Sequence, residues 1–335
     1  MVKRTLIAAV ALLICVSAGT ARAGAAYATL GSAPGISTQF ASSSCADPVT
    51  GAPSGPAVVS ATSTAFGRAL VIGAGSYAGC SLYLLTSDQF HSLSGAAFAC
   101  SDNANALGAP CDSVLWPALL TNGRPLAGPG INPTLLGTVT RDDLPGLPAV
   151  QQVTYAGHPL YRFLFDETPG ETEGANLFDP VTSPAGTWYL VDPSQGLPAT
   201  GRAQLQIETA PLKGTGPAET VLAATMNDDF SVFPNADFPV YTLSTDGGHA
   251  SACQEKCALT WQPVLTSGPV EAGAGVDEHA LGIIVRPDGT HQATYNGKPL
   301  YQFVRDAYIA GIVGTPGIFG AGASTPFGVF SPIAL

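Results

Sequence analysis

Charged residues are scarce in this chain, and basic residues are the scarcest. They make up 11% of the 335 residues, with 13 Lys and Arg against 24 Asp and Glu, for a formal charge of −11. An acidic surface repels nucleic acid and anionic membranes, so we expect neither as a partner. With 39 Gly and 28 Pro, the composition favours many short strands and tight turns over long amphipathic helices.

The motifs of the common catalytic and cofactor sites are also missing. The sequence has no Gly-x-Ser-x-Gly nucleophile turn, no His-Glu-x-x-His zinc motif, no Cys-x-x-Cys-His haem attachment, no phosphate-binding loop and no dinucleotide fingerprint. We therefore predict no catalytic residue and no cofactor, and an enzyme is the less favoured interpretation.

A long apolar run occurs only at the start of the chain, from Leu6 to Val16. It follows Lys3-Arg4 and precedes Ala21-Arg22-Ala23, which together are typical of a signal peptide over residues 1–23, cleaved after Ala23. Removing these three basic residues leaves ten against 24 acidic ones, a formal charge of −14.

No later segment is long and apolar enough to cross a membrane, so none is predicted in the mature chain. Cys15 follows the bulky Ile14, which is a poor lipidation signal. The start of the chain thus favours a soluble secreted or periplasmic protein over a lipid-anchored one.

Four copies of a Tyr-x4-Asp motif organise the rest of the chain. In the two best copies an Ala-Gly or Asn-Gly pair predicts a β-hairpin, and the alternation that follows predicts a half-buried strand. We expect each Tyr to be buried and each Asp to cap backbone N–H groups in a turn, with a ligand or metal role for the Asp as the alternative. The pairs are Tyr83 and Asp88, Tyr161 and Asp166, Tyr241 and Asp246, and Tyr301 and Asp306.

The two halves of the chain repeat other features in the same order, which indicates an internal duplication. Trp116 corresponds to Trp261, and the strand from Leu136 to Arg141 to the one from Leu281 to Arg286. The strand at Trp188 corresponds to residues 326–332, with Phe327 in place of the tryptophan. Aromatic residues at matched points are expected in the core.

We predict an all-β fold of four related antiparallel β units in two duplicated halves. Four consecutive strands in a unit favour propeller-like closure over two tandem β-sandwiches. The expected divisions are a signal peptide (1–23), an irregular N-terminal extension with one or two strands (24–68), a first half (69–193), a linker with a short strand near 203–209 (194–219) and a second half (220–335).

The repeated segments resemble a known family. Gly-x-Pro-Leu followed by Tyr-x-Phe-x-x-Asp, with Cys253-x3-Cys257 and Trp261 in the second half, is similar to the bacterial secreted-repeat lipoproteins, whose biochemical function is not established. The resemblance covers roughly residues 69–335. Leu85 and Leu243 depart from it, because they replace the middle aromatic residue of the motif.

Six cysteines remain after the signal peptide, and an even number in an exported chain implies disulfides. Matched positions in the two halves should pair alike. This predicts Cys100–Cys111 and Cys253–Cys257, and leaves Cys45–Cys80 as the third pair.

Three groups of side chains have an alternative chemical interpretation. On a helix, His249, Cys253 and Cys257 would share one face as soft-metal ligands; a disulfide beside an exposed histidine is the favoured interpretation. His158 lies at a hairpin turn where the other copies have Lys298 and Cys80, which favours solvent exposure. Asp166, Glu171 and Glu173 could act as an acid–base or calcium set, but a solvated acidic loop is favoured.

We therefore expect an exported, non-enzymatic β-repeat protein that serves as a binding or structural module at the cell envelope or outside it. Its ligand is not indicated. The alternative is a metal- or redox-handling extracytoplasmic protein that uses the region of His249, Cys253 and Cys257.

Overall fold

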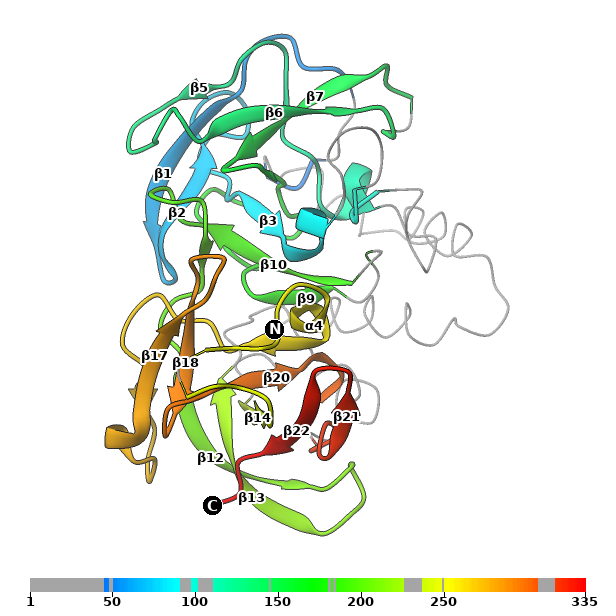
Figure 1. The fold of residues 1–335 in the computed structure, drawn as a ribbon. Helices are drawn as coiled ribbons and strands as arrows, with labels where there is room; N and C mark the ends of the chain where they lie inside the picture. Colours follow the sequence, from blue (N-terminus) through cyan, green and yellow to red (C-terminus); the bar gives the residue numbers. More distant parts are fainter. Residues whose placement is uncertain are drawn as a thin grey trace, which may run out of the picture. The chain divides into compact units, whose positions relative to one another are not determined.

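The fold consists almost entirely of β-strands and loops (Figure 1). The computed structural model describes residues 45–47, 51–90, 98–101, 111–144, 146–179, 182, 185–225, 237–248, 250–306 and 317–335. They divide into two compact units, which we call unit 1 (up to Ala199) and unit 2 (Thr200–Leu335). The all-β prediction is confirmed, while the predicted signal peptide lies outside the described residues.

In the described residues of unit 1, short strands are accompanied by two single helical turns. The strands pair as three sheets, with the orders β2-β1-β5, β4-β7-β6 and β11-β10-β3. Its elements are β1 (Val58–Thr64), β2 (Gly67–Ile72), β3 (Tyr83–Leu85), the 3₁₀ turn η1 (Thr86–Phe90), the π-helical turn η2 (Cys111–Leu115), β4 (Leu120–Thr121), β5 (Leu126–Ala127), β6 (Leu136–Arg141), β7 (Val150–Tyr155), β8 (His158–Pro159), β9 (Leu177–Asp179), β10 (Gly186–Val191) and β11 (Pro198–Ala199).

The described residues of unit 2 form strands in two sheets, together with the short helix α4 and a 3₁₀ turn. The larger has the order β15-β20-β14-β13-β12-β16, with β22 on β14, and the smaller has the order β17-β18-β19. Its elements are β12 (Gln204–Pro211), β13 (Ala218–Thr225), β14 (Asp237–Leu243), α4 (Lys256–Thr260), β15 (Trp261–Pro263), β16 (Glu271–Ala272), the 3₁₀ turn η3 (Glu278–Ala280), β17 (Leu281–Val285), β18 (His291–Tyr295), β19 (Lys298–Pro299), β20 (Tyr301–Phe303), β21 (Ala323–Thr325) and β22 (Gly328–Pro332).

The two units repeat the same strand pairings. In unit 1, β1 pairs with β2 antiparallel and with β5 parallel; in unit 2, β12 does the same with β13 and β16. The hairpins of β6 with β7 and of β17 with β18 also correspond, as do β10 and β22, which lie antiparallel to β3 and β14. The predicted duplication is therefore present in the strand pairings of the described residues.

The duplication begins earlier in each half than the motifs indicate. β1 lies within residues 24–68, where an irregular extension with one or two strands was predicted, and β12 lies within 194–219, where a linker with a short strand near 203–209 was predicted. Each is instead the first strand of its unit, hydrogen-bonded along its length to the next strand. The two hairpins have unlike sequences and turns of different length, so a motif comparison does not align them.

The predicted propeller-like closure is not found. In the described part of the chain, the strands form several separate open sheets within two units rather than a ring of similar blades. The strands that were assigned to one blade are divided between sheets. In unit 1, β7 and β10 belong to different sheets.

Matching hairpin turns precede the second motif in each unit. Ala156 (φ 50°) and Gly157 (φ 88°) connect β7 to β8, and Asn296 (φ 50°) and Gly297 (φ 74°) connect β18 to β19. Two successive residues with positive φ match the right-handed twist of the flanking strands. Asn and Gly tolerate this conformation, whereas Ala does not, so unit 1 contains a locally unfavourable residue at this turn.

An aromatic stack forms the centre of each unit. In unit 1, Trp116 stacks between Phe163, at 4.0 Å between ring centroids, and Trp188, at 3.8 Å. In unit 2, Trp261 stacks in the same way between Phe303, at 4.5 Å, and Phe330, at 3.7 Å. The first tyrosine of each unit meets the central tryptophan edge-on, at 5.5 Å for Tyr83 and 5.3 Å for Tyr241.

The expectation that Phe327 takes the place of Trp188 is wrong. Phe330, three residues further on, stacks on Trp261 and pairs with Leu243, as Trp188 pairs with Leu85. Phe327 is 42% exposed. Phe327 lies in the two-residue turn between β21 and β22, so it precedes the strand and is not part of it.

Candidate functional site

The four motifs come together in pairs, one pair in each unit. The two tyrosines of a pair lie directly opposite each other on antiparallel strands: Tyr83 faces Tyr161, and Tyr241 faces Tyr301. A local two-fold relation therefore passes between the tyrosines of each unit. Each tyrosine is within reach of the aspartate that belongs to the other motif.

In unit 1 the motifs exchange hydrogen bonds. The Tyr83 hydroxyl donates to Asp166 Oδ2 at 2.7 Å, and the Tyr161 hydroxyl donates to Asp88 Oδ2 at 2.8 Å. All four side chains are buried, with at most 1% of their surface exposed. The tyrosine of each motif thus binds the aspartate of the other, across 83 and 73 residues of sequence.

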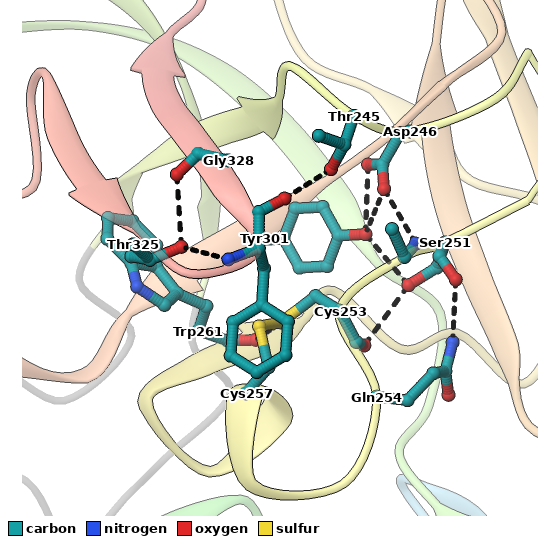
Figure 2. Close-up of a disulfide and its surroundings, with 12 residues drawn as sticks. Thr245, Asp246, Ser251, Cys253, Gln254, Cys257, Trp261, Tyr301, Thr325 and Gly328 are labelled. Atoms are coloured by element: carbon teal, nitrogen blue, oxygen red, sulfur yellow. Dashed lines mark hydrogen bonds between the residues drawn. A yellow bond between two sulfur atoms is a disulfide. The ribbon is translucent and has the colours of Figure 1, made fainter.

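Unit 2 repeats the exchange. The Tyr241 hydroxyl donates to Asp306 Oδ2 at 2.6 Å, and the Tyr301 hydroxyl donates to Asp246 Oδ2 at 2.9 Å. Figure 2 shows Tyr301 with its hydroxyl directed at Asp246, and at Ser251, whose Oγ lies 2.8 Å away. The same geometry occurs twice in the chain, and we call each such arrangement a reciprocal lock.

The remaining oxygen of each aspartate holds the loop that follows its own motif. Each Oδ1 accepts a backbone N–H from a residue 6 to 13 positions further along the chain. This agrees with the expected capping role, but the loops are longer than a single turn. The donors are Ala99 for Asp88 (2.9 Å), Glu173 for Asp166 (2.8 Å), Ala252 for Asp246 (2.8 Å) and Phe319 for Asp306 (3.0 Å).

Burial changes the acidity of the lock carboxyls. Desolvation raises the pKa of Asp88 to about 6 and that of Asp306 to about 7, although hydrogen bonds from tyrosine and backbone groups oppose the rise. Desolvation also raises the pKa of Asp166, and that of the half-buried Asp246. Asp88 and Asp306 can therefore hold a proton near neutral pH. Each of the four carboxyls is hydrogen-bonded to a tyrosine of the other motif in its unit, so it stabilises the pairing of the two repeats.

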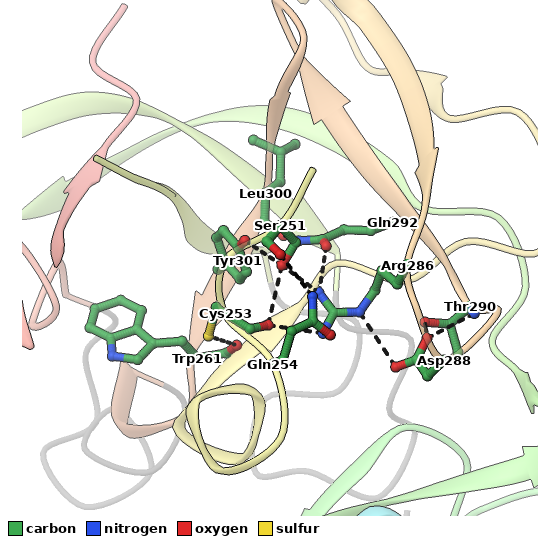
Figure 3. Close-up of polar contacts among 10 residues, drawn as sticks. All are labelled: Ser251, Cys253, Gln254, Trp261, Arg286, Asp288, Thr290, Gln292, Leu300 and Tyr301. Carbon is green, nitrogen blue, oxygen red and sulfur yellow. Dashed lines mark hydrogen bonds and ion pairs between the residues drawn. The ribbon is translucent and has the colours of Figure 1, made fainter. Parts of the chain in front are cut away.

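A buried arginine lies beside each lock, a feature that the sequence reasoning missed. Arg286 Nη1 donates to Gln292 Oε1 at 2.7 Å, and its Nη2 donates to the carbonyl of Cys253 at 2.9 Å, as Figure 3 shows. Gln292 in turn donates to the carbonyl of Leu300, just before Tyr301. The guanidinium thereby connects β17, the disulfide segment and the strand that carries the lock tyrosine.

Unit 1 contains the same arrangement around Arg141. Its Nη1 donates to Gln152 Oε1 at 2.8 Å and its Nη2 to the carbonyl of Cys100 at 3.2 Å, while Gln152 donates to the carbonyl of Leu160. Here the guanidinium also forms an ion pair with the buried Asp112. A sequence signal was present, because an arginine ends both matched strands and a glutamine lies at the same place in both partner strands.

Three disulfides join the pairs that the duplication predicts. The Cα–Cα distances are 5.6 Å for Cys45–Cys80, 5.3 Å for Cys100–Cys111 and 5.2 Å for Cys253–Cys257. The last two lie beside the arginine networks, as the carbonyls of Cys100 and Cys253 show. The cysteines therefore stabilise the loops around each lock.

The structure does not assemble the proposed metal set. Cys253 and Cys257 are joined to each other, and His249 lies outside the described residues. Among the residues that are described, no group of three or more His, Cys, Asp or Glu side chains could hold a metal ion.

The other two candidate groups lie in different surroundings. His158 is mostly buried rather than exposed, and desolvation lowers its pKa. Glu171 Oε2 accepts the backbone N–H groups of Glu167 at 2.5 Å and Thr168 at 3.0 Å, which folds the loop after Asp166. Since Asp166 binds Tyr83 and the Glu173 N–H, these carboxylates shape a loop.

Two segments of the chain are similar to a known protein family. Residues 150–191 and 282–314 each match the family described as a secreted repeat of unknown function. No curated protein and no solved structure matches the chain. In the described part of the chain, no helix is long and apolar enough to span a membrane. The two matched segments, which carry the second motif of each unit, are therefore similar to the secreted repeats of unknown function.

Proposed function

We propose that this chain is an exported, non-catalytic β-repeat protein that acts as a binding or structural module at the cell envelope or outside it. The reciprocal locks carry this proposal. The chemical groups that recur four times in the sequence are directed at one another inside the units, where they bind the two repeats of a unit together.

Because the locks are buried, a binding site is expected on the outer surface of the units. Three of the four motif carboxylates are at most 1% exposed, so a ligand could reach them only after the unit opens. Repeats held by an internal lock are suited to a rigid scaffold whose strand edges and loops make outside contacts. The three disulfides and the secreted-repeat match support an extracytoplasmic location, which agrees with export by a signal peptide cleaved after Ala23.

The oxidation state of the exported protein tests this proposal against a metal- or redox-handling role. The native mass is measured without reductant, after exposure to a thiol-alkylating reagent. We expect it to correspond to a chain that begins at Gly24. The mass should correspond to three disulfides, with no alkyl group and no bound metal. Alkylation that maps to Cys253 and Cys257, or a stoichiometric metal lost with them, would overturn the proposal in favour of the alternative.

A catalytic role is tested separately. Turnover of peptide, ester or glycoside substrates by the purified protein would contradict a non-catalytic module, provided that the activity is retained through a final size-exclusion step. We expect none above the level of buffer.

A further inference from the structure

β17 lies at the open edge of its sheet. The order of the sheet is β17-β18-β19, so the described part of the chain pairs β17 with β18 alone. The register is antiparallel over all five residues, from Leu281 opposite Tyr295 to Val285 opposite His291. Figure 1 shows the two strands as a long hairpin. The outer edge of β17 can accept a further strand, because edge strands carry unpaired N–H and C=O groups.

This edge is apolar on one face. Ile283 is 41% exposed and Val285 is 66% exposed, and both lie on the same face as Leu281 because side chains alternate along a strand. Leu281 packs against a core cluster that includes Ala293, Val240 and Leu300. The apolar surface therefore continues from the core of unit 2 to the open edge. Charged residues and prolines, which often protect edges, are absent from Leu281–Val285.

The corresponding strand of unit 1 shows that the fold does not require this surface. β6 has the same pairing with β7, and its burial alternates in the same way, but it carries Thr138 and Thr140 at the positions of Ile283 and Val285. Two hydroxyl side chains satisfy the same architecture. The folding of unit 2 therefore does not explain why Ile283 and Val285 are apolar and exposed, whereas contact with a partner would.

Charge identifies the kind of partner. Asp277 and Glu278 lie exposed just before β17. Asp288 lies just after it, with its side chain 47% exposed and its carboxylate 3.6 Å from Nε of the buried Arg286. In an antiparallel pair of two copies, Asp277 and Glu278 of each copy would face Asp288 of the other, which is unfavourable. A partner with basic residues at its ends is favoured over a second copy.

We propose that the open edge of β17 binds an extended peptide segment of another protein as an added strand. Alternate apolar side chains of this segment cover Ile283 and Val285, and lysines or arginines at its ends meet Asp277, Glu278 and Asp288. Main-chain hydrogen bonds give the affinity and the side chains give the selectivity, as in other cases of strand addition. This inference rests on the proposed binding role and gives it a partner.

A synthetic probe tests the interaction with the full exported protein. The probe is a fluorescent peptide of alternating valine and threonine flanked by two lysines at each end, and binding is followed by anisotropy. Glutamate in place of the lysines should weaken binding by at least about tenfold. N-methylation of the backbone amides that face β17 should abolish it, since these groups would form the new ladder. Equal binding of all three peptides would overturn the proposal.

Substitutions locate the site. The double variant I283T/V285T gives β17 the residues of β6, so we expect it to fold, and it should weaken binding of the lysine-flanked probe by at least about tenfold. V285K should have a similar effect by repelling the basic peptide. The matched variant T138S/T140S in unit 1 should bind like the original chain. Loss of binding in the matched variant, or none in the other two, would overturn the proposal.

Sedimentation of the protein alone distinguishes a peptide segment of another protein from a second copy of this chain as the occupant of the β17 edge. A dimer that forms at micromolar concentration and is lost in I283T/V285T would overturn the proposal by assigning the edge to a second copy. A negative result in the peptide experiments does not affect the evidence from the locks and disulfides. The proposed role as a binding or structural module is tested separately, by the mass and turnover measurements.

Discussion

At the residue scale, the tyrosine hydroxyls determine what the motif does. The Tyr-x4-Asp spacing suggests a pair acting within one strand and turn, yet each hydroxyl donates to the aspartate of the other motif. In Asp88, Asp166 and Asp306 the two Oδ atoms have different partners, one from the opposite repeat and one from the aspartate's own loop. In Asp246 the Oδ1 atom accepts from both Tyr301 and the loop. A single carboxylate thereby fixes a contact between repeats and the fold of a segment.

The pKa of the lock carboxyls predicts an unusual pH dependence. Burial raises the pKa of Asp306 to about 7, from a value near 3.8 in the unfolded chain. The folded state therefore binds a proton more readily, and this stabilising contribution is complete below pH of about 4 and lost as the pH rises through about 7. Each unit of pKa difference corresponds to about 1.4 kcal/mol.

Urea denaturation between pH 4.5 and 8 measures this contribution. For the original chain we expect the free energy of unfolding to fall over this range relative to that of D306N, which cannot titrate at this position. A difference between the two proteins that is constant with pH, or that grows in favour of the original chain as the pH rises, would contradict the raised pKa.

The hairpin turns give a second prediction at this scale. Ala156 and Asn296 occupy the same position with φ of 50°. Since an alanine in the left-handed region costs about 1 kcal/mol, A156G should raise the free energy of unfolding by about that amount, and N296A should lower it. Thermal and urea unfolding of both variants provide the measurement. Equal signs for the two changes would argue against the turn geometry.

At the element scale, the disulfides differ in how much chain they enclose. Cys45–Cys80 spans 35 residues, and Cys253–Cys257 spans only 4, at the start of α4. The entropy of the unfolded chain is reduced more by the longer loop. We therefore expect replacement of Cys45 and Cys80 by serine to destabilise unit 1 by about 4 kcal/mol, against about 2 kcal/mol in unit 2 for Cys253 and Cys257.

Chemical denaturation of the two double-serine variants tests this order. The smaller loop is also held by Arg286, which donates a hydrogen bond to the carbonyl of Cys253 independently of the disulfide. A larger loss for the Cys253–Cys257 pair than for Cys45–Cys80 would mean that local packing, rather than loop length, controls the stability of these segments.

Several elements could be predicted from the sequence, and the reasons differ. The hairpins before Tyr161 and Tyr301 were predicted because Ala-Gly and Asn-Gly specify a turn locally. β1 and β12 were not recognised as equivalent, because their hairpins share a pairing pattern but no motif. Phe330 was passed over for Phe327, since the sequence does not show that the strand begins only at Gly328, after Phe327.

At the scale of the whole molecule, the sequence showed the duplication but not how the repeats associate. Spacing within a strand does not indicate which distant segment lies opposite, so the partner of each tyrosine was beyond prediction. The four motifs belong to two units, each held by a reciprocal lock, and not to a ring of equal blades. A pair of repeats, rather than one repeat, is therefore the smallest set that satisfies all of these polar groups.

A double-mutant cycle in unit 2 tests the reciprocal lock most directly. Tyr241→Phe is combined with Asp306→Ala, its partner across the two motifs, and separately with Asp246→Ala, the aspartate of its own motif. Free energies of unfolding from urea denaturation give the coupling energy of each pair. Asp306→Asn replaces the alanine variant if the latter does not fold. We predict a coupling of about 1–3 kcal/mol across the motifs and about 0.5 kcal/mol or less within one motif. The opposite order, or no coupling in either pair, would contradict the account.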